Sequence, residues 1–203
     1  MICHSGSVEA GEKLVAPIKA FGAPVGDIIQ RRPYLTQQTL IDATQPKGRR
    51  YYWKSEFLPG LSSELLAKVL ENARRIVSPQ SGIVLFPIDG ALKQLPEDHS
   101  SVGNRDAAVV LNITASWESP EEDAANIEWA RTSWQDMGRF STGGAYMNFM
   151  TEDEGAERIH TAYRMNYERL VQVKTKWDPE NLFRMNKNIP PLSRVAKPRQ
   201  MLT

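Results

Sequence analysis

Apolar residues recur along this chain with two different periods, and the periods separate strands from helices. Between residues 107 and 117, one set of alternating positions is wholly apolar, and the other becomes polar along its length. A period of two is typical of a strand with one buried face. Residues 50–57, rich in aromatic side chains, and the short apolar run 81–87 are two further strand candidates, and residues 145–150 are a fourth.

Helical periodicity, with apolar residues three or four apart, marks the segments between these strands. Ser7, Ser62 and Ser119 stand at the starts of three such segments, where a serine hydroxyl can accept a hydrogen bond from a backbone amide of the first turn. Pro120 follows Ser119 and Glu122 lies three positions after it, as in a capping box. We expect helices over residues 7–21, 35–43, 62–77, 91–95, 119–138 and 155–176, and a further turn at 178–180.

The order of these elements indicates the fold class. Several successive strands lack a helical crossover between them, so an all-parallel sheet is disfavoured. We predict an α+β fold: a largely antiparallel sheet with helices packed on one face. No glycine-rich strand-to-helix turn of the dinucleotide-binding or P-loop type is present in the sequence.

Charge and composition exclude several classes of partner. Twenty-five basic and 24 acidic residues give a net charge of +1, so we expect neither nucleic acid nor a membrane as partner. The single cysteine, Cys3, cannot form an internal disulfide, and no stretch reaches the ~20 apolar residues of a membrane span. The first residues do not resemble a signal peptide, which favours a cytoplasmic protein. The three histidines lack partners at metal-ligand spacing, so no metal site is expected.

Three groups of polar residues are candidates for chemistry, and each has two interpretations. Asn112 and Thr114 lie on the polar side of their strand, which either meets solvent or lines a pocket. Lys54 is flanked by aromatic residues and is either an edge-protecting lysine or a partly desolvated cation that faces a ligand. Tyr146 and Asn148, two apart on a predicted strand, either orient a polar ring system or make a structural hydrogen bond.

Three segments stand in order at the end of the chain: Gly-Gly-Ala-Tyr-Met-Asn-Phe-Met at 143–150, Asn-Tyr-Glu-Arg-Leu at 166–170 and the run from Trp177 to Pro191. Together they resemble the C-terminal signature of berberine-bridge-type FAD-linked oxidases. Upstream, Arg-Arg-Tyr-Tyr-Trp-Lys-Ser at 49–55 and Arg-Asp-Ala-Ala at 105–108 resemble the substrate domain of that family. The resemblance divides the chain into a substrate-type domain at 1–142, a berberine-bridge-like segment at 143–191 in the same structural domain, and a tail at 192–203.

This resemblance implies a function. Such enzymes oxidise a small alcohol, sugar or amine by hydride transfer to flavin, and their C-terminal part forms a sheet over the flavin ring. The resemblance implies catalytic positions at Tyr146, Lys54 and Asn112 and cofactor-binding positions at Asn148 and Asn186. Many relatives carry Glu or Gln where Asn112 stands, so a carboxylate base is absent at this position.

The resemblance also implies partners. No residue here matches the positions at which such enzymes attach FAD, so we expect the cofactor to be shared with an N-terminal FAD-binding domain or a partner subunit. Half of a cleft cannot bury a flavin, and the exposed docking face favours self-association. The alternative hypotheses are a non-catalytic module that binds a small ligand or acts as an interaction module, and an inactive remnant.

Overall fold

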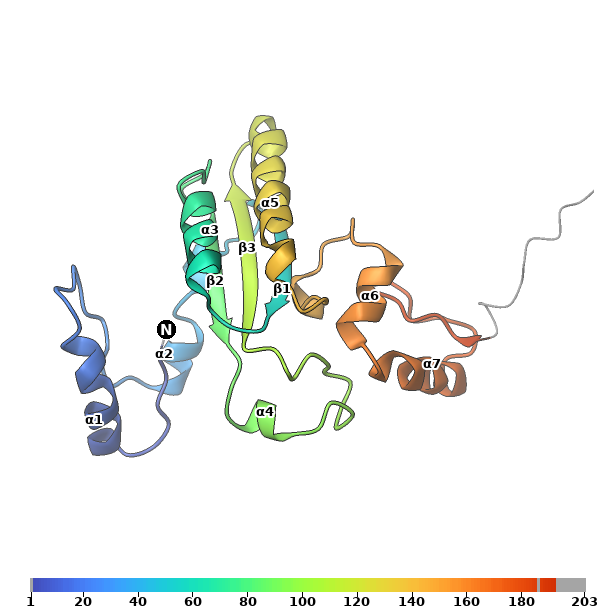
Figure 1. The fold of residues 1–203 in the computed structure, drawn as a ribbon, viewed down its shortest axis with the longest axis horizontal. Coiled ribbons are helices and arrows are strands. Elements are labelled where there is room, and N and C mark those ends of the chain that lie inside the picture. Colours follow the sequence, from blue (N-terminus) through green and yellow to red (C-terminus); the bar gives the residue numbers. More distant parts are fainter. Residues whose placement is uncertain (1, 186, 193–203) are drawn as a thin grey trace, which may run out of the picture. The chain divides into compact units, whose positions relative to one another are not determined.

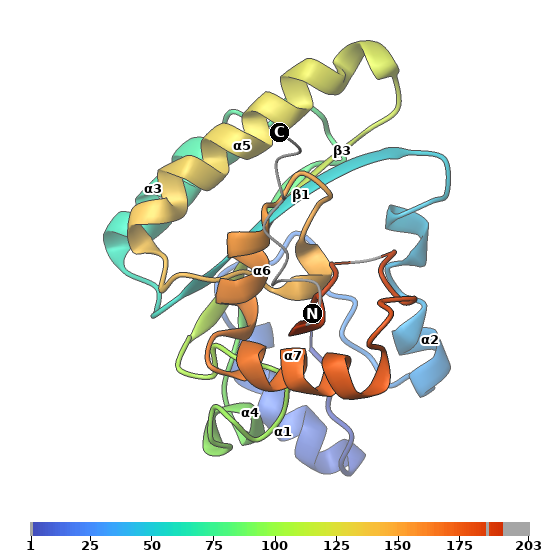
Figure 2. The ribbon, with the colours of Figure 1, turned by 90° about the vertical axis from the view of Figure 1, so that its right-hand side faces the viewer.

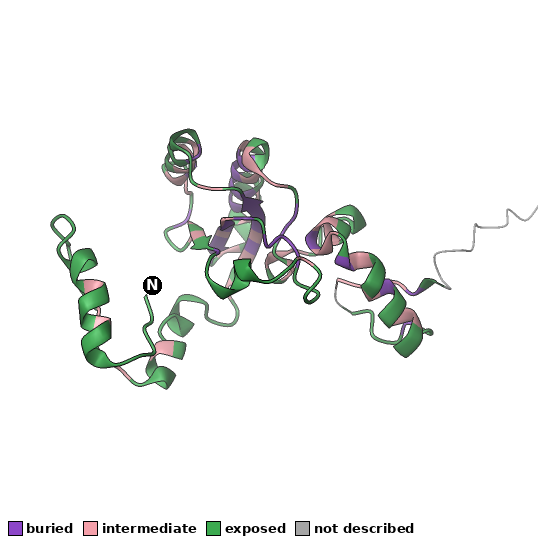
Figure 3. Ribbon diagram, turned by 60° about the horizontal axis from the view of Figure 1, so that its bottom comes forward, coloured by how far each residue is buried: buried purple, intermediate pink, exposed green. Residues whose placement is uncertain are grey.

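The computed structural model describes residues 2–185 and 187–192, and it divides the chain into two compact units, residues 1–48 and 49–203 (Figure 1). The first unit contains α1 (Val8–Lys19), α2 (Tyr34–Gln38) and the 3₁₀ turn η1 (Asp42–Thr44). Ser7 caps α1 by accepting a hydrogen bond from the amide of Ala10, as its position predicted. None of the described residues of this unit is buried, so it has no core of its own (Figure 3).

The second unit is built on a three-stranded antiparallel sheet in the order β1–β3–β2. Its strands are β1 (Arg50–Leu58), β2 (Gly82–Pro87) and β3 (Val109–Trp117). Its helices and 3₁₀ turns are α3 (Ser63–Ala73), α4 (Ala91–Gln94), η2 (Pro120–Glu122), α5 (Asp123–Met137), η3 (Gly138–Phe140), η4 (Met147–Phe149), α6 (Ala156–Tyr163) and α7 (Asn166–Trp177). The predicted α+β class with an antiparallel sheet is confirmed.

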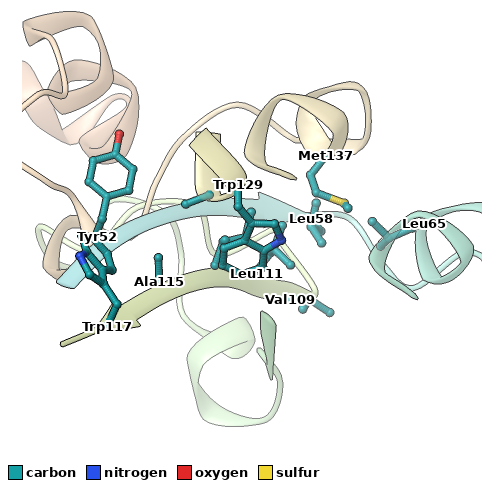
Figure 4. Close-up of a cluster of buried hydrophobic side chains, with 11 residues drawn as sticks. Tyr52, Leu58, Leu65, Val109, Leu111, Ala115, Trp117, Trp129 and Met137 are labelled. Carbon is teal, nitrogen blue, oxygen red and sulfur yellow. The ribbon is translucent and has the colours of Figure 1, made fainter. Parts of the chain in front are cut away.

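Helices α3 and α5 lie side by side on one face of the sheet (Figure 2). The core lies between them and the strands, and its buried side chains come from alternate positions of β1 and β3 and from the inner sides of α3 and α5 (Figure 4). Leu111 and Ile113 at the centre of β3 are fully buried. At about 25 cal/mol per Å² of apolar area, this burial is the main stabilising term of the unit. Because side chains alternate across a strand, the remaining positions point to the opposite face.

Two predicted elements differ in the structure. The segment 145–150 is not a strand; it forms the 3₁₀ turn η4, in which the amide of Phe149 bonds to the carbonyl of Tyr146 at 2.8 Å. The predicted helix 155–176 is two helices that separate at Arg164, whose φ is +49°. Arg164 contacts Asp106 at 2.6 Å. This long-range contact accompanies a break that no glycine or proline marks in the sequence.

The other boundaries agree with the sequence analysis to within a few residues. Ser62 caps α3 and Ser119 with Glu122 forms the predicted capping box before α5. Among the helices of the described residues, none is both long enough and apolar enough to cross a bilayer. The predicted division at residue 142 stays a prediction. The two compact units of the structure are divided after residue 48 instead.

Candidate functional site

The candidate site lies on the face of the sheet opposite α3 and α5, which we call the η4 face because the turn η4 passes over it. Its aromatic side chains form a connected cluster around Phe149. The Phe149 ring lies 5.0 Å from that of Tyr146, 6.2 Å from that of Trp53 and 5.8 Å from that of Phe86, measured between ring centroids. Tyr51 extends the cluster, with its ring 6.1 Å from Trp53.

The strand register shows how the aromatic neighbours of Phe149 are arranged around β3. Trp53 of β1 is opposite Thr114, and Phe86 of β2 is opposite Val110, so the two aromatic residues flank β3 on either side. Asn112 is the β3 residue midway between Thr114 and Val110 on the same face. The Phe149 ring therefore contacts one aromatic residue on each side of β3, on the face to which Asn112 points.

Asn112 and its neighbour across the strands have unusual hydrogen bonding. Ser55 is paired with Asn112 in the register of β1 and β3, so both side chains point to the η4 face. The amide nitrogen of Asn112 donates to the hydroxyl of Thr114 at 3.0 Å. The Oδ1 of Asn112, the Oγ of Ser55 and the indole nitrogen of Trp53 are buried and have no hydrogen-bond partner among the described residues. Such groups are costly unless a ligand or water completes them.

Tyr146 and Asn148 lie together at the margin of this face. The side-chain amide of Asn148 donates to the hydroxyl oxygen of Tyr146 at 2.9 Å, although the segment is a 3₁₀ turn and not a strand. Tyr146 is 37% exposed, so its hydroxyl is accessible to a ligand. Because its oxygen already accepts from Asn148, the phenolic proton is free to be donated elsewhere.

Lys54, the third predicted catalytic residue, lies on the other face of the sheet. Only 4% of the residue is exposed. Its ammonium lies 3.0 Å from Glu154 and 3.1 Å from Asp153, and it approaches the ring of Trp134 of α5 at 5.4 Å. It therefore neither protects an exposed edge nor faces the same side as Asn112.

The groups around Lys54 form a network of equal and opposite charge, which we call the Lys54 network. It consists of Tyr52, Lys54, Glu56, Arg131, Asp153, Glu154 and Arg158. Arg158 of α6 bonds to Glu56 at 2.9 Å and to the carbonyl of Ser55 at 2.9 Å. The network thus fixes α6 to the strand that carries Ser55.

The electrostatics of the network favour the charged form of Lys54. Burial of its ammonium opposes ionisation, but the hydrogen bond and charge of Glu154, with further bonds to Asp153 and Tyr52, raise the pKa of Lys54. Burial likewise opposes ionisation of Asp153, yet hydrogen bonds from Thr151, Tyr52, Arg131 and Lys54 hold the pKa of this carboxyl far below its usual range. Both shifts favour the ionised forms of Lys54 and Asp153, as expected of an ion pair.

The remaining predicted site residue, Asn186, lies outside the described residues. Sequence reasoning missed Ser55, Trp53 and Phe149 as members of the site. Alternation along β1 separates Trp53 and Ser55 from Lys54 in the sequence itself. Which β3 residues lie beside Trp53 and Ser55, however, could be known only from the strand register. Among the residues that the structure describes, no group of three or more potential ligand side chains could hold a metal ion.

A hollow of about 550 Å³ lies within the first unit. It is lined by residues between Ile2 and Gln37, including Cys3 and His4. None of the described residues of that unit is buried, so the hollow is a surface depression between loosely packed segments. The η4 face is the better candidate because it carries buried polar atoms that lack partners among the described residues.

Known proteins resemble this chain in sequence over part or most of its length. Residues 145–190, which include η4, match the family described as "Berberine and berberine like". An FAD-linked oxidoreductase of Dictyostelium discoideum is 25% identical over 95% of this chain and 42% of its own length. The FAD-linked oxidoreductase YgaK of Bacillus subtilis is 26% identical over 90% of this chain and 41% of its own. The chain therefore spans about two fifths of the length of these relatives.

The same fold occurs in solved structures. A variant of berberine bridge enzyme superimposes with a TM-score of 0.78 and 17% identity, over 93% of this chain and 45% of the other. At this identity the similarity shows the fold alone. Family match, curated relatives and fold agree, and they identify the chain as related to berberine-bridge-type FAD-linked oxidoreductases.

Proposed function

We propose that this chain forms the substrate-side part of an FAD-dependent oxidoreductase that oxidises a small alcohol, sugar or amine. The observation that carries the proposal is the η4 face. It combines an aromatic cluster, an accessible tyrosine hydroxyl and four buried polar atoms that have no partner among the described residues, on Trp53, Ser55, Asn112 and Ser116. A surface that is apolar with a few fixed polar groups is typical of small-molecule sites.

The residues of this face fit one side of a flavin ring system. The ring is planar, uncharged over much of its area and bordered by hydrogen-bonding atoms, and the η4 face offers aromatic rings together with Asn112, Ser55 and Trp53. When bound, FAD would supply the acceptor for the hydride. The described residues offer no phosphate-binding loop, so we propose that an FAD-binding domain or subunit holds the rest of the cofactor.

Within this site the chain's own residues have separate roles. Tyr146 donates or accepts the proton of the reacting group, and Asn148 holds the Tyr146 hydroxyl in place. Asn112 orients substrate or cofactor by hydrogen bonding, since an amide cannot act as a base. The Asn148 and Asn186 side chains stay candidates for direct contact with the cofactor.

Co-expression with the FAD-binding region of a relative such as YgaK tests this proposal. The purified complex should retain a visible flavin absorption band after desalting, and the band should bleach under anaerobic conditions with a suitable alcohol, sugar or amine. The chain alone, incubated with FAD and desalted, serves as the reference. If neither preparation retains flavin, the proposed function is wrong.

A second candidate is a non-catalytic module that binds a small ligand. The observation that favours it is Asn112, which cannot take a proton at the centre of the η4 face. Retention of flavin without bleaching by any member of a broad substrate panel would support this second function.

A further inference from the structure

The two edges of the sheet differ in how their backbone groups are satisfied. At the β1 edge, carbonyls accept hydrogen bonds from the segment 142–158. They belong to Trp53, Ser55 and Phe57 and lie 2.9 to 3.4 Å from their donors. At the other edge, β2 pairs with β3 alone, and within the described part of the chain no other segment bonds to its backbone. The protein therefore covers one edge of its sheet and leaves the other open.

The alternation of the antiparallel ladder identifies the open groups of β2. The amide of Ile88, just after the strand, bonds to the carbonyl of Ala108 at 2.8 Å. Successive residues of a strand direct their backbone groups to opposite sides, so the even-numbered residues of β2 face β3. The amides and carbonyls of Ile83 and Leu85 therefore point away from the sheet. Pro87 also points outward, but it has no amide hydrogen to donate.

β2 lacks the features that commonly keep an edge strand from pairing. Its sequence, Gly-Ile-Val-Leu-Phe-Pro, contains no charged residue, and its proline stands at the last position. Edge strands of monomeric proteins are often protected by lysine, internal proline or a bulge. Val84 and Phe86 are instead apolar and 41% and 42% exposed. Two copies of this strand can meet without repulsion between like charges, which favours a second copy of the chain as its partner.

Helix α3 adds an apolar surface beside the same edge. It lies on the β2 side of the sheet, whereas α5 lies on the β1 side (Figure 1). Glu64 and Arg75 of α3 pair with residues of η3 and α5. Because each helical position turns by about 100°, Leu66 and Leu70 lie on the side of α3 that faces away from α5. They are 39% and 58% exposed, so the apolar surface continues from β2 onto α3.

We propose that the β2 edge pairs with the β2 edge of a second copy of this chain, giving a twofold-symmetric dimer with one continuous antiparallel sheet. The twofold axis of such a pairing is perpendicular to the sheet, so the two α3 helices lie on the same face. Leu66 and Leu70 of each copy then face the other copy across the axis. The same surface serves both partners, as in other isologous dimers.

One register satisfies the open groups best. Centred on Val84, it lets Ile83 exchange amide and carbonyl hydrogen bonds with Leu85 of the second copy. The same register places Phe86 across from Gly82 of the second copy, and an aromatic ring over an edge glycine helps to fix a strand register. Centring the pairing on Leu85 instead would oppose Ile83 to a proline, which has no amide hydrogen. Val84 therefore lies opposite its own copy at the axis.

Sedimentation velocity of the full chain tests the dimer. The unaltered chain should dimerise at micromolar concentration, and because each copy has one β2 edge, association should stop at the dimer. Val84→Lys and Val84→Glu each place like charges face to face at the axis and should weaken dimerisation by about tenfold or more. Val102→Lys is the control, since Val102 is similarly exposed, at 46%, and lies on a loop.

Mixing the two charged variants separates loss of pairing from loss of folding. Val84→Lys and Val84→Glu should form a heterodimer together, because opposite charges then face each other across the axis, whereas misfolded chains would not regain a partner on mixing. A monomeric unaltered chain, growth beyond a dimer, a dimer that Val84→Lys leaves unchanged, or no heterodimer in the mixture would each overturn the proposal. The dimer goes beyond the proposed function and needs no flavin, so failure of either leaves the other standing.

Discussion

Lys54 and Glu154 form an ion pair of 3.0 Å in which both side chains are almost completely buried, at 5% and 2% exposure. Glu154 belongs to the segment before α6, so this pair joins the outer strand of the sheet to the C-terminal helices. The lysine that the sequence marks as a candidate catalyst therefore belongs to an ion-pair network that links β1 to α6.

Removal of the Lys54 charge should destabilise the protein strongly. Lys54→Met leaves Asp153 and Glu154 without their ammonium partner, and the loss of one partner from a buried pair costs about 3–5 kcal/mol of unfolding free energy. Urea denaturation measures the change. Lys68→Met, which breaks the more exposed pair with Glu71, is the matched control and should cost about 1 kcal/mol or less. Equal losses in the two variants would contradict a buried ion pair at Lys54.

Stability should fall at both extremes of pH, for opposite reasons. The pKa of Asp153 is lowered in the folded state, so its contribution is present above the unfolded value of about 3.9 and is lost as the pH falls toward the folded value. The pKa of Lys54 is raised, so its contribution is complete below about 10.4 and is lost as the pH rises through the folded value. Asp153→Asn should flatten the acid limb of urea midpoints plotted against pH, whereas Asp98→Asn, at an exposed position, should not.

The cap of α3 should contribute measurably to stability. The hydroxyl of Ser62 accepts the backbone amide of Leu65 at 3.1 Å. Ser62→Ala removes that acceptor and should cost about 1 kcal/mol in thermal or urea unfolding. The adjacent Ser63→Ala changes the same residue type inside the helix, and a loss as large as that of Ser62→Ala there would refute the cap assignment.

Gly144 should not tolerate a side chain. Its φ is +135°, and a Cβ atom at this position would lie 2.7 Å from Oδ1 of Asn104 and 3.1 Å from the carbonyl of Thr161. Gly144→Ala should therefore destabilise the protein by about 1–3 kcal/mol. Gly60→Ala is the control, because a Cβ atom added at Gly60 would meet nothing within 4 Å. Similar melting temperatures for the two variants would be inconsistent with this packing.

Loss of the Tyr146 hydroxyl should affect turnover and not folding. In the flavin-containing complex, Tyr146→Phe should lower kcat by about 10²–10⁴-fold with a smaller effect on KM, the range typical of a lost proton-transfer group. Tyr167→Phe is the control. Tyr167 lies on α7, and its ring packs against that of His160 with 4.5 Å between centroids, so this variant should keep kcat within a few-fold of the unaltered value. An unaltered kcat in Tyr146→Phe would remove this residue from the catalytic machinery.

Much of the framework could be predicted from local sequence. Alternation in β3 identified its apolar and polar sides correctly, because a strand with a period of two has only two faces. Ser7, Ser62 and Ser119 marked helix starts correctly, because a cap depends on amides within the next three residues. The signature around η4 also indicated the family, since it depends on residue identity and spacing alone.

The features that local sequence did not predict are accompanied by contacts between residues far apart in the chain. The break at Arg164 is accompanied by its contact with Asp106, and the turn at η4 by the packing of Phe149 across two strands. Neither partner is near in sequence, so periodicity could not reveal them.

The sequence by itself determined which side chains this protein has available: a lysine among aromatic residues, an asparagine on a polar strand face, and a tyrosine with an asparagine two positions later. Only the tertiary structure decided where each points. The register of β1 and β3 put Ser55 beside Asn112 and turned Lys54 to the opposite face. The physical reason is that one residue of shift along a strand reverses every side chain, and register is set by partners distant in the sequence.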